Sequence, residues 1–296
     1  MMMRKILVAG VLVLSACGLI NGLSASKVMV ATLLHTPAIE LKPSYIAGFD
    51  ASIPQFDAGG FMFDAGGFDV NDAGITVPEQ TAAIAYLGDR SGGDISTPPK
   101  GVEKATFTVK SGSTVTLKEI GAGSYQLLSK DEPALVYAQG SDVDFVAKVD
   151  GQTFTGRVEK VPKEEKIAAF HPAAGFIDLA AGTDFAFVRP DAPAGETRPL
   201  GFVVVVPISR DGKQGDPTYT NVPKTPVEFL KLVVAPGKPW QETQVTIPGS
   251  AFPDKEKNYV ILLQSAKLGG PVGENLFTGS AIIAGTADVG IVKTRP

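Results

Sequence analysis

The chain has 296 residues, a mildly acidic net charge of −4 and a single cysteine. This length accommodates two domains of ordinary size. The charge balance, with no basic run in the sequence, excludes a nucleic-acid-binding footprint, and a single cysteine excludes an internal disulfide. The 33 glycines and 22 prolines exceed average usage, which favours many turns and few long helices.

The first sixteen residues have the layout of a secretory signal peptide. Arg4 and Lys5 form a short positive region, residues 6–14 are apolar, and Ser15 and Ala16 are the small residues that a cleavage site requires. The apolar run is too short for a stable membrane-spanning helix, which needs about 20 residues. Residues 1–16 are therefore predicted to be removed.

The order Leu14-Ser15-Ala16-Cys17 resembles the lipobox of bacterial lipoproteins. The resemblance implies that the signal is cut before Cys17, which then carries acyl chains such as palmitate. Several acyl chains exceed what stable membrane anchoring needs. Gly18 stands where an aspartate would signal inner-membrane retention, so the resemblance favours the outer membrane over the inner one. An ordinary secretory signal with a fortuitous cysteine is the alternative.

Residues 17–45 are predicted to be a lipid-anchored tether. Within them, residues 26–34 fit a short helix capped by a preceding serine. They fit a strand equally well, because Val28, Val30 and Thr32 alternate with other residues. The pattern leaves both structures open.

A phenylalanine repeat occupies residues 46–76. Phe-Asp-Ala units begin at Phe49, Phe56 and Phe63, and the glycine pairs that follow two of them each cost about 1 kcal/mol per glycine in a helix. The segment is therefore predicted to be a disordered linker. It could act as a spacer above the membrane, pack on the protein's own first domain, or dock on a partner. The candidate partner contacts are Phe56, Phe61, Phe63 and Phe68.

Short strands separated by turn residues follow from Val77 onward. Asp150-Gly151 between residues 145–149 and 152–158 is a strong hairpin signal. The charged, proline-marked residues 161–166 suggest a domain boundary. The predicted fold class is all-β, with two antiparallel sandwiches of immunoglobulin or fibronectin III type, at residues 77–162 and 167–296.

The last segment resembles the second half of a fibronectin type III or related immunoglobulin-like domain. The resemblance rests on Trp240, the apolar residues 245–247, and Phe252 seven positions before Tyr259, the spacing of a tyrosine corner. The chain departs from that family at residues 269–273, where a longer hairpin loop is expected. Such domains are mostly adhesive, scaffolding or spacing modules.

Residues suited to catalysis are few. The sequence has two histidines, His35 and His171, and no nucleophile-elbow, zinc-protease or phosphate-loop motif. Two histidines are too few for a zinc site. The carboxylates that could form a glycosidase pair are interpreted as solvent-facing strand residues; they are Asp142, Asp144, Asp178 and Asp184. We therefore expect no enzyme and no cofactor.

Calcium is the better ion hypothesis, although both candidate segments are incomplete. Residues 69–74 have a displaced third acidic position, and Gln80 stands where a calcium loop has its bidentate glutamate. Residues 211–216 fit a hairpin turn better than a ligand set. We therefore expect no metal.

These observations predict a non-catalytic cell-envelope lipoprotein that presents a protein-interaction or scaffolding surface. It would be held at the membrane by its N-terminal lipid and would contact an envelope protein rather than nucleic acid. The alternative is a glycan-binding or small-ligand-binding module. Such modules usually expose a platform of aromatic side chains, and Trp240 fits either such a platform or a sandwich core.

Overall fold

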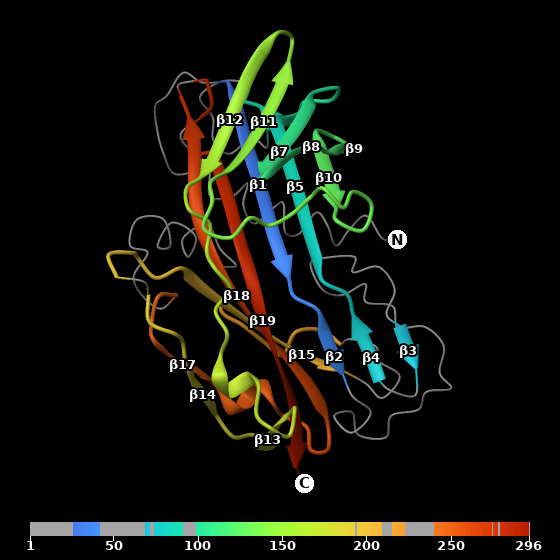
Figure 1. Cartoon of the computed structure of the whole chain (residues 1–296), viewed down its shortest axis with the longest axis vertical. Helices are drawn as coiled ribbons and strands as arrows, with labels where there is room; N and C mark the ends of the chain where they lie inside the picture. Colours follow the sequence, from blue (N-terminus) through green and yellow to red (C-terminus); the bar gives the residue numbers. More distant parts are fainter. Residues whose placement is uncertain are drawn as a thin grey trace.

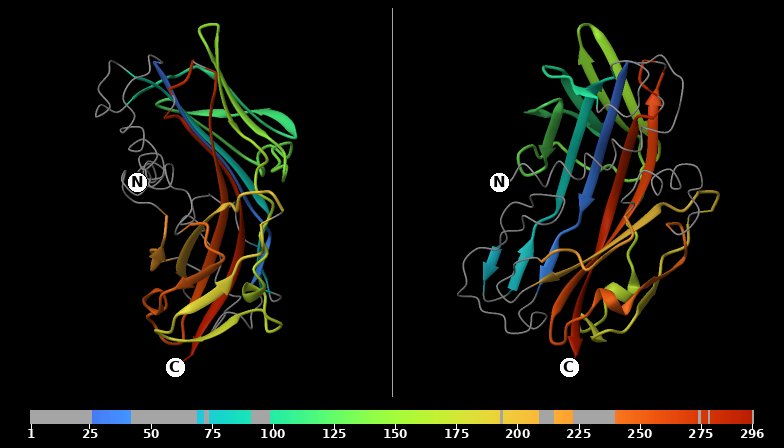
Figure 2. Two further views of the ribbon diagram at one scale, coloured as in Figure 1. Left: turned by 90° about the vertical axis from the view of Figure 1, so that its left-hand side faces the viewer. Right: turned by 180° about the vertical axis from the view of Figure 1, so that it is seen from behind.

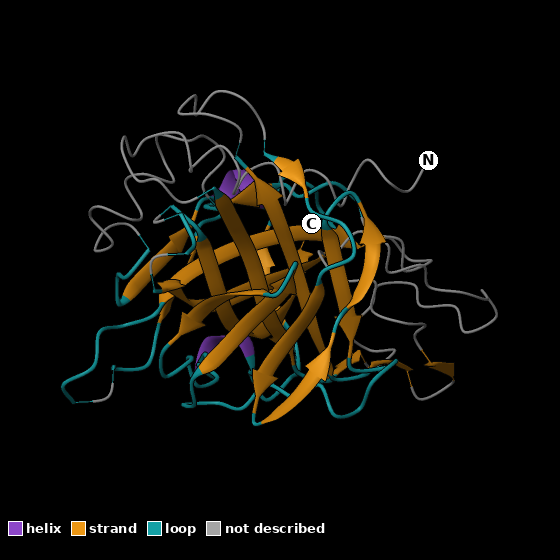
Figure 3. Ribbon diagram, turned by 90° about the horizontal axis from the view of Figure 1, so that it is seen from above, coloured by secondary structure: helices purple, strands orange, loops and turns teal. Residues whose placement is uncertain are grey.

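In the part of the chain that the structure describes, β-strands are the main regular secondary structure. The computed structural model describes residues 26–41, 69–71, 74–90, 99–192, 194–208, 215–222, 240–273, 275–277 and 279–295. The helices there are two short 3₁₀ turns, η3 (Ala168–Phe170) and η4 (Gly249–Ala251) (Figure 3). No helix in these ranges is long and apolar enough to cross a membrane. The all-β fold class is confirmed.

Fourteen strands form one mixed sheet, and ten of them follow one path through it (Figure 1). In spatial order the ten are β8 (Ser113–Thr116), β7 (Thr106–Ser111), β11 (Val143–Val149), β12 (Gln152–Val158), β18 (Asn258–Val272), β19 (Ala281–Arg295), β1 (Lys27–Thr36), β5 (Gln80–Asp89), β10 (Ser124–Leu128) and β9 (Lys118–Gly121). The other four are β6 (Lys100–Gly101) on β5, β13 (Ile177–Ala180) on β19, β15 (Leu200–Ile208) on β18, and β16 (Tyr219–Thr220) on β15.

The two ends of this path are consecutive in the chain. Only Leu117 separates β8 from β9, and its N–H donates to the carbonyl of Phe107 at 2.8 Å. One continuous stretch of chain therefore pairs with β7 through its first half and with β10 through its second half. The sheet curls round until its outermost strands meet, so neither end of the path is a long free edge open to further pairing.

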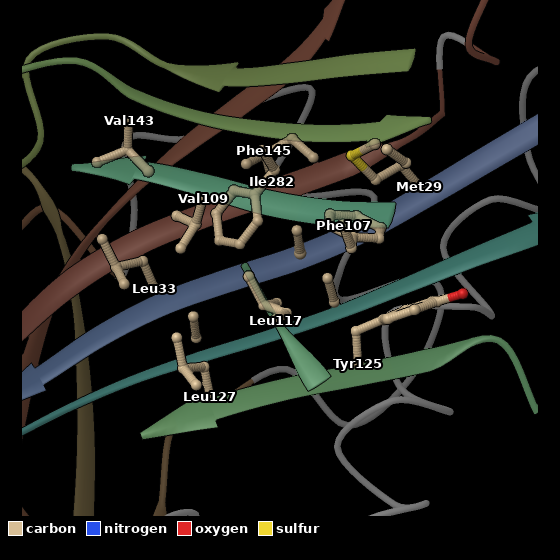
Figure 4. Packing of buried hydrophobic residues seen from close by; sticks show 14 of the residues in the cluster. Met29, Leu33, Phe107, Val109, Leu117, Tyr125, Leu127, Val143, Phe145 and Ile282 are labelled. Atoms are coloured by element: carbon tan, nitrogen blue, oxygen red, sulfur yellow. The ribbon is translucent and has the colours of Figure 1, made fainter. Parts of the chain in front are cut away.

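The larger hydrophobic core lies inside this curl, and we call it the upper core from its place in Figure 1. Alternate residues of each strand point inward, and they meet in the cluster shown in Figure 4. Its fully buried members include Met29, Leu33, Phe107, Val109, Phe145 and Ile282. Gly156 belongs to this packing, because a Cβ there would lie 2.4 Å from Cδ1 of Ile282.

The lower core lies between two layers. One layer is the β13–β19–β18–β15–β16 part of the large sheet, and the other is a two-stranded sheet of β14 (Phe185–Val188) and β17 (Gln244–Ile247). Phe187 and Ile247 from the small sheet pack with Val205 and Ile261 from the large one. The two views of Figure 2 show the small sheet at the lower end of the molecule.

The strands β18 and β19 run through both halves. At 15 residues each, they are about 50 Å long. The start of β18 contributes Tyr259 and Ile261 to the lower core, and the start of β19 contributes Ile282 and Ala284 to the upper core. The two predicted sandwiches are thus not separate: two cores share one sheet.

The extra length of β18 comes from residues expected to form a loop. Gly270, Pro271 and Val272 continue β18 and pair with β12. Gly269 makes this possible, because a Cβ at that position would lie 1.9 Å from the carbonyl oxygen of Arg157. Gly269 therefore permits close backbone approach here rather than a turn.

For residues 26–34 the sequence left a helix and a strand open, and the structure has the strand β1 over residues 27–36. The strand β1 lies between β5, which is antiparallel to it, and β19, which is parallel. The tether predicted for residues 17–45 therefore contains a central strand of the sheet. Farther along, β2 (Ile39–Leu41), β4 (Gly74–Val77) and β3 (Asp69–Asn71) form a separate three-stranded sheet. Most of the predicted linker, residues 46–76, lies outside the described residues.

We expect the two cores to unfold together, because β18 and β19 belong to both. Phe107→Ala in the upper core and Phe252→Ala in the lower core should each cost about 3–5 kcal/mol. Calorimetry should show a single transition that moves down in both variants, and Val188→Ala, at a side chain 63% exposed, should leave it nearly unchanged. Two transitions, only one of which responds to each substitution, would contradict this expectation.

Candidate functional site: the polar junction between the two cores

A row of polar side chains crosses the inner face of the large sheet. Thr81 of β5 is paired with His35 of β1, His35 with Thr286 of β19, and Thr286 with Ser265 of β18. Paired residues on adjacent strands present their side chains on the same face. We call these four residues the polar row.

The polar row lies where the two cores meet. On one side of it are Leu33, Ala83 and Ala284 of the upper core. On the other side are Leu263 and Val292 of the lower core. The inner face of the sheet therefore changes from apolar to polar and back to apolar along β19.

His35 is held in the row by its neighbours. Its Nδ1 lies 3.2 Å from Thr81 Oγ1, and its ring stacks on Tyr137 with 5.7 Å between centroids. Burial lowers the pKa of His35, and the negative charges of Glu79 and Glu164 partly oppose this effect. The result is an imidazole that favours its neutral form and is fixed by a hydroxyl and an aromatic ring.

Thr286 is at the centre of the row and is 1% exposed. Its hydroxyl is buried and has no hydrogen-bond partner within the described part of the chain. A buried hydroxyl without a partner costs about 1–3 kcal/mol. The Thr286 hydroxyl is therefore a polar group at the junction that no hydrogen bond from the described residues satisfies.

Asp288 follows two residues later on the same face of β19 and is 3% exposed. Its Oδ2 accepts the N–H of Ile167 at 2.7 Å, and its Oδ1 lies 2.8 Å from Nε2 of His171. Oδ1 also accepts the N–H of Val289 at 2.9 Å. This carboxylate thereby fixes the segment between the upper and lower halves to the central strand.

In the Asp288–His171 pair a carboxylate contacts an imidazole, as in the catalytic sites of many hydrolases. Such a pair needs a nucleophile beside it to carry out hydrolysis. A carboxylate that orients an imidazole activates a nucleophile only when a hydroxyl or thiol lies within hydrogen-bond reach. In the described residues, the hydrogen bond of the His171 ring goes to Asp288. The arrangement supports positioning of the chain between the halves.

A second buried charge lies beside the junction. The Arg189 side chain is fully buried, and its Nε and Nη2 donate to the two carboxylate oxygens of Glu165 at 2.8 and 2.9 Å. Nη1 and Nη2 also donate to the carbonyls of Trp240 and Pro199, both at 2.9 Å. Gly201 leaves room for this guanidinium, because a Cβ there would lie 2.6 Å from Nη1.

Sequence reasoning did not single out Asp288, Arg189 or Glu165. A signal was nevertheless present for two of them. Asp288 interrupts the apolar run 281–292, and Arg189 ends the apolar strand 185–188. A charge within an otherwise buried strand is rarely tolerated without a partner, so each position indicates a specific contact.

The four aspartates considered for glycoside hydrolysis have structural partners. Asp144 forms a bidentate pair with Arg157, and Asp178 pairs with Arg295. Asp142 and Asp184 accept the backbone N–H groups of Lys160 and Gly249. They are spread over both halves of the molecule rather than gathered at one site.

The remaining predicted sites divide between described and undescribed residues. Cys17, Phe56, Phe61, Phe63 and Phe68 lie outside the described residues, as do residues 211–214 of the second calcium candidate. In the first candidate, Asn71 of β3 pairs with Gly74 of β4, as in a hairpin. Among the described residues, no group of three or more His, Cys, Asp or Glu side chains could hold a metal ion.

Trp240 is buried rather than part of an exposed platform. It is 6% exposed and packs with Leu200, Phe202 and Ala266. Its Nε1 donates to the carbonyl of Asn221 at 2.8 Å. The tryptophan therefore contributes to a small core beside the sheet.

Comparison with known proteins does not assign this architecture to a family. No protein family and no curated protein matches the chain.

We expect the Arg189–Glu165 pair to matter for stability because it is buried. Glu165→Ala leaves the guanidinium buried without its carboxylate, which should lower the free energy of unfolding by about 3–5 kcal/mol. Asp178→Ala breaks an ion pair in which both side chains are more than half exposed, and it should cost less than about 1 kcal/mol. Urea denaturation of both variants measures their free energies of unfolding. Equal decreases in the two variants would contradict the expectation that the buried pair contributes more to stability.

His35 should make stability depend on pH. Its pKa is lower in the folded protein than the ordinary value of 6.5, so the unfolded chain binds more protons below that pH. The free energy of unfolding should therefore fall as pH drops through about 6.5 and continue to fall down to the folded pKa.

The matched variant is His35→Gln, which keeps a hydrogen-bonding group beside Thr81 but does not titrate. Urea denaturation of both proteins at about pH 7.5 and about pH 5.5 should show a smaller loss on acidification for the variant. An identical loss in the two proteins would rule His35 out as the source.

Proposed function

We propose that this chain is a non-catalytic cell-envelope lipoprotein, anchored through acylated Cys17, that presents an interaction surface to an envelope protein. The observation that supports it most is how close the lipobox cysteine lies to the folded body. Eight residues, 18–25, separate Cys17 from Ser26, and β1 begins at Lys27. A lipid at Cys17 would therefore be attached almost directly to a central strand.

The structure of the lower half supports an interaction module. We propose that it is an immunoglobulin-type sandwich, with β14 and β17 in one layer and β13, β19, β18, β15 and β16 in the other. Phe252 packs edge-on against Tyr259 with 5.5 Å between ring centroids, and Tyr259 Oη accepts the N–H of Asp254 at 3.1 Å. This local arrangement is compatible with a tyrosine corner, as the resemblance implies.

The glycan-binding alternative loses its main support. Trp240 was its candidate for an exposed aromatic platform, and this side chain is buried, with its ring nitrogen donating to a backbone carbonyl. A protein partner is favoured over a small ligand for this reason.

The phenylalanine segment is the proposed partner contact, and its place in the chain argues against the spacer interpretation. Its four phenylalanines, Phe56, Phe61, Phe63 and Phe68, come between β2 and β3 in the chain, and both of these strands pair with β4. They follow β1 in the chain, so they do not connect Cys17 to the fold. We propose that Phe56, Phe61, Phe63 and Phe68 contact the partner, at the periplasmic side of the outer membrane.

Replacing the cysteine tests the anchor. In cells fed labelled palmitate, the wild-type protein should take up label and fractionate with membranes. Cys17→Ser should do neither, because no other thiol is present in the chain. Ser24→Ala, a change of similar size outside the lipobox, should behave as wild type. Palmitate label on the Cys17→Ser variant would refute the proposal.

A further inference from the structure

The start of β1 is fixed to the body by contacts on both sides. The N–H of Arg90 donates to the carbonyl of Ser26 at 2.7 Å, and the N–H of Phe277 donates to the carbonyl of Lys27 at 2.8 Å. Lys27 also forms an ion pair with Asp89, and the Arg90 guanidinium lies 3.8 Å from the centre of the Phe277 ring. The chain therefore leaves the fold toward Cys17 at a defined point.

This point lies at the upper end of the molecule. The strand β1 runs downward from Lys27, and the register places Lys27 beside Asp89, at the end of β5 (Figure 1). The tip of the β11–β12 hairpin is at the same end in both views of Figure 2. The turn 253–257, before β18, and the C-terminal end of β19 are at the opposite, lower end.

The reach of residues 18–25 is short compared with the molecule. Nine steps from Cys17 to Ser26 span at most about 30 Å when fully extended, whereas β18 alone extends about 50 Å between the two ends. The link therefore allows the lipid to lie close to the upper end. It is too short to extend from Ser26 to the lower end of the molecule.

Charge at the upper end does not favour another orientation. Lys100, Lys104 and Lys148 are exposed there, and so are Glu103 and Asp150. Among the described residues of this end the two signs are nearly balanced, and they provide little attraction to anionic lipid. The covalent link is therefore the main constraint on how the body meets the membrane.

We propose that the upper end, where β1 begins, faces the lipid headgroups, and that the lower end, with the β2–β4–β3 sheet, points away from the membrane. This inference rests on the acylation of Cys17 proposed above. It places β2 and β3, the strands on either side of the phenylalanine segment in the chain, in the membrane-distal half (Figure 1). A partner that docks beside these strands would be an envelope protein that reaches the half of the body farther from the anchoring membrane.

Energy transfer from single labels to the bilayer tests this orientation. Acylation blocks Cys17, so an added cysteine is the only free thiol. The sites are Gln152→Cys, at the hairpin tip of the upper end, and Lys255→Cys, in the turn at the lower end, both exposed. Each acylated protein is labelled with a donor dye and placed in phosphatidylethanolamine–phosphatidylglycerol vesicles that contain an acceptor-labelled lipid.

Transfer from position 152 should be several-fold stronger than transfer from position 255. Equal transfer, or stronger transfer from position 255, overturns the orientation. A control protein with about 30 Gly and Ser residues inserted after Asn21 adds a reach of roughly 30 Å, and it should lose most of the contrast. Contrast that survives the insertion overturns the argument that the link sets the orientation, because the upper end would then face the membrane without a short link.

The palmitate measurement separates the two proposals. Absence of acyl groups on Cys17 in these proteins refutes the lipoprotein proposal, and the orientation with it. Acyl groups on Cys17 together with equal transfer from the two labels refute the orientation alone. Circular dichroism of each labelled variant checks that the β-fold is retained.

Discussion

The pairing of β18 with β19 is the interaction on which the rest of the fold depends. Their antiparallel register runs from Asn258–Lys293 to Gly269–Ile282. Every other part of the large sheet attaches to one of these two strands, through β12 and β15 on one side and through β1 and β13 on the other. Because the pair extends beyond a single core, two packed interiors form on one continuous backbone ladder.

Because the β18–β19 pair belongs to both cores, the side chains on the inner face of the sheet change from apolar to polar where the cores meet. The junction between the two interiors brings His35, Thr286 and Asp288 onto the inner face of the sheet, and it buries Arg189 nearby. Buried polar and charged groups are costly unless they are paired. Asp288 is paired with Ile167 and His171 of the chain between the halves, and Arg189 is paired with Glu165 of the same chain. Hydrogen bonds therefore help to fix the position of that chain, together with the apolar packing of Ile167 and Phe170.

Local features were predictable from the sequence because local chemistry determines them. Asp150-Gly151 forms the expected hairpin, with positive φ at both residues, and the alternation of Val28, Val30 and Thr32 is that of a strand. Phe252 and Tyr259 meet as their spacing implied. The all-β class follows from many such short signals taken together.

The shared architecture was not predictable in the same way. The parallel pairing of β1 with β19 joins segments about 250 residues apart in the chain, and nothing in either segment specifies the other. Gly269 and Gly270 have the composition of a turn, but both lie within β18, and Gly269 permits the close approach of β12. The partners of Arg189 come from residues 165, 199 and 240, a convergence that appears only once the chain is folded.

The position of β1 also determines how the molecule would carry a mechanical load. Tension applied at its N-terminal side enters along the strand axis, parallel to β1 itself. The ladder to β5 extends over all ten residues of β1, and the ladder to β19 extends over six of them. Such a pull loads these hydrogen bonds in shear, all at once, instead of opening them one after another from an end. The fold would thus receive such a force through a strand that is held by a ladder of hydrogen bonds on each side.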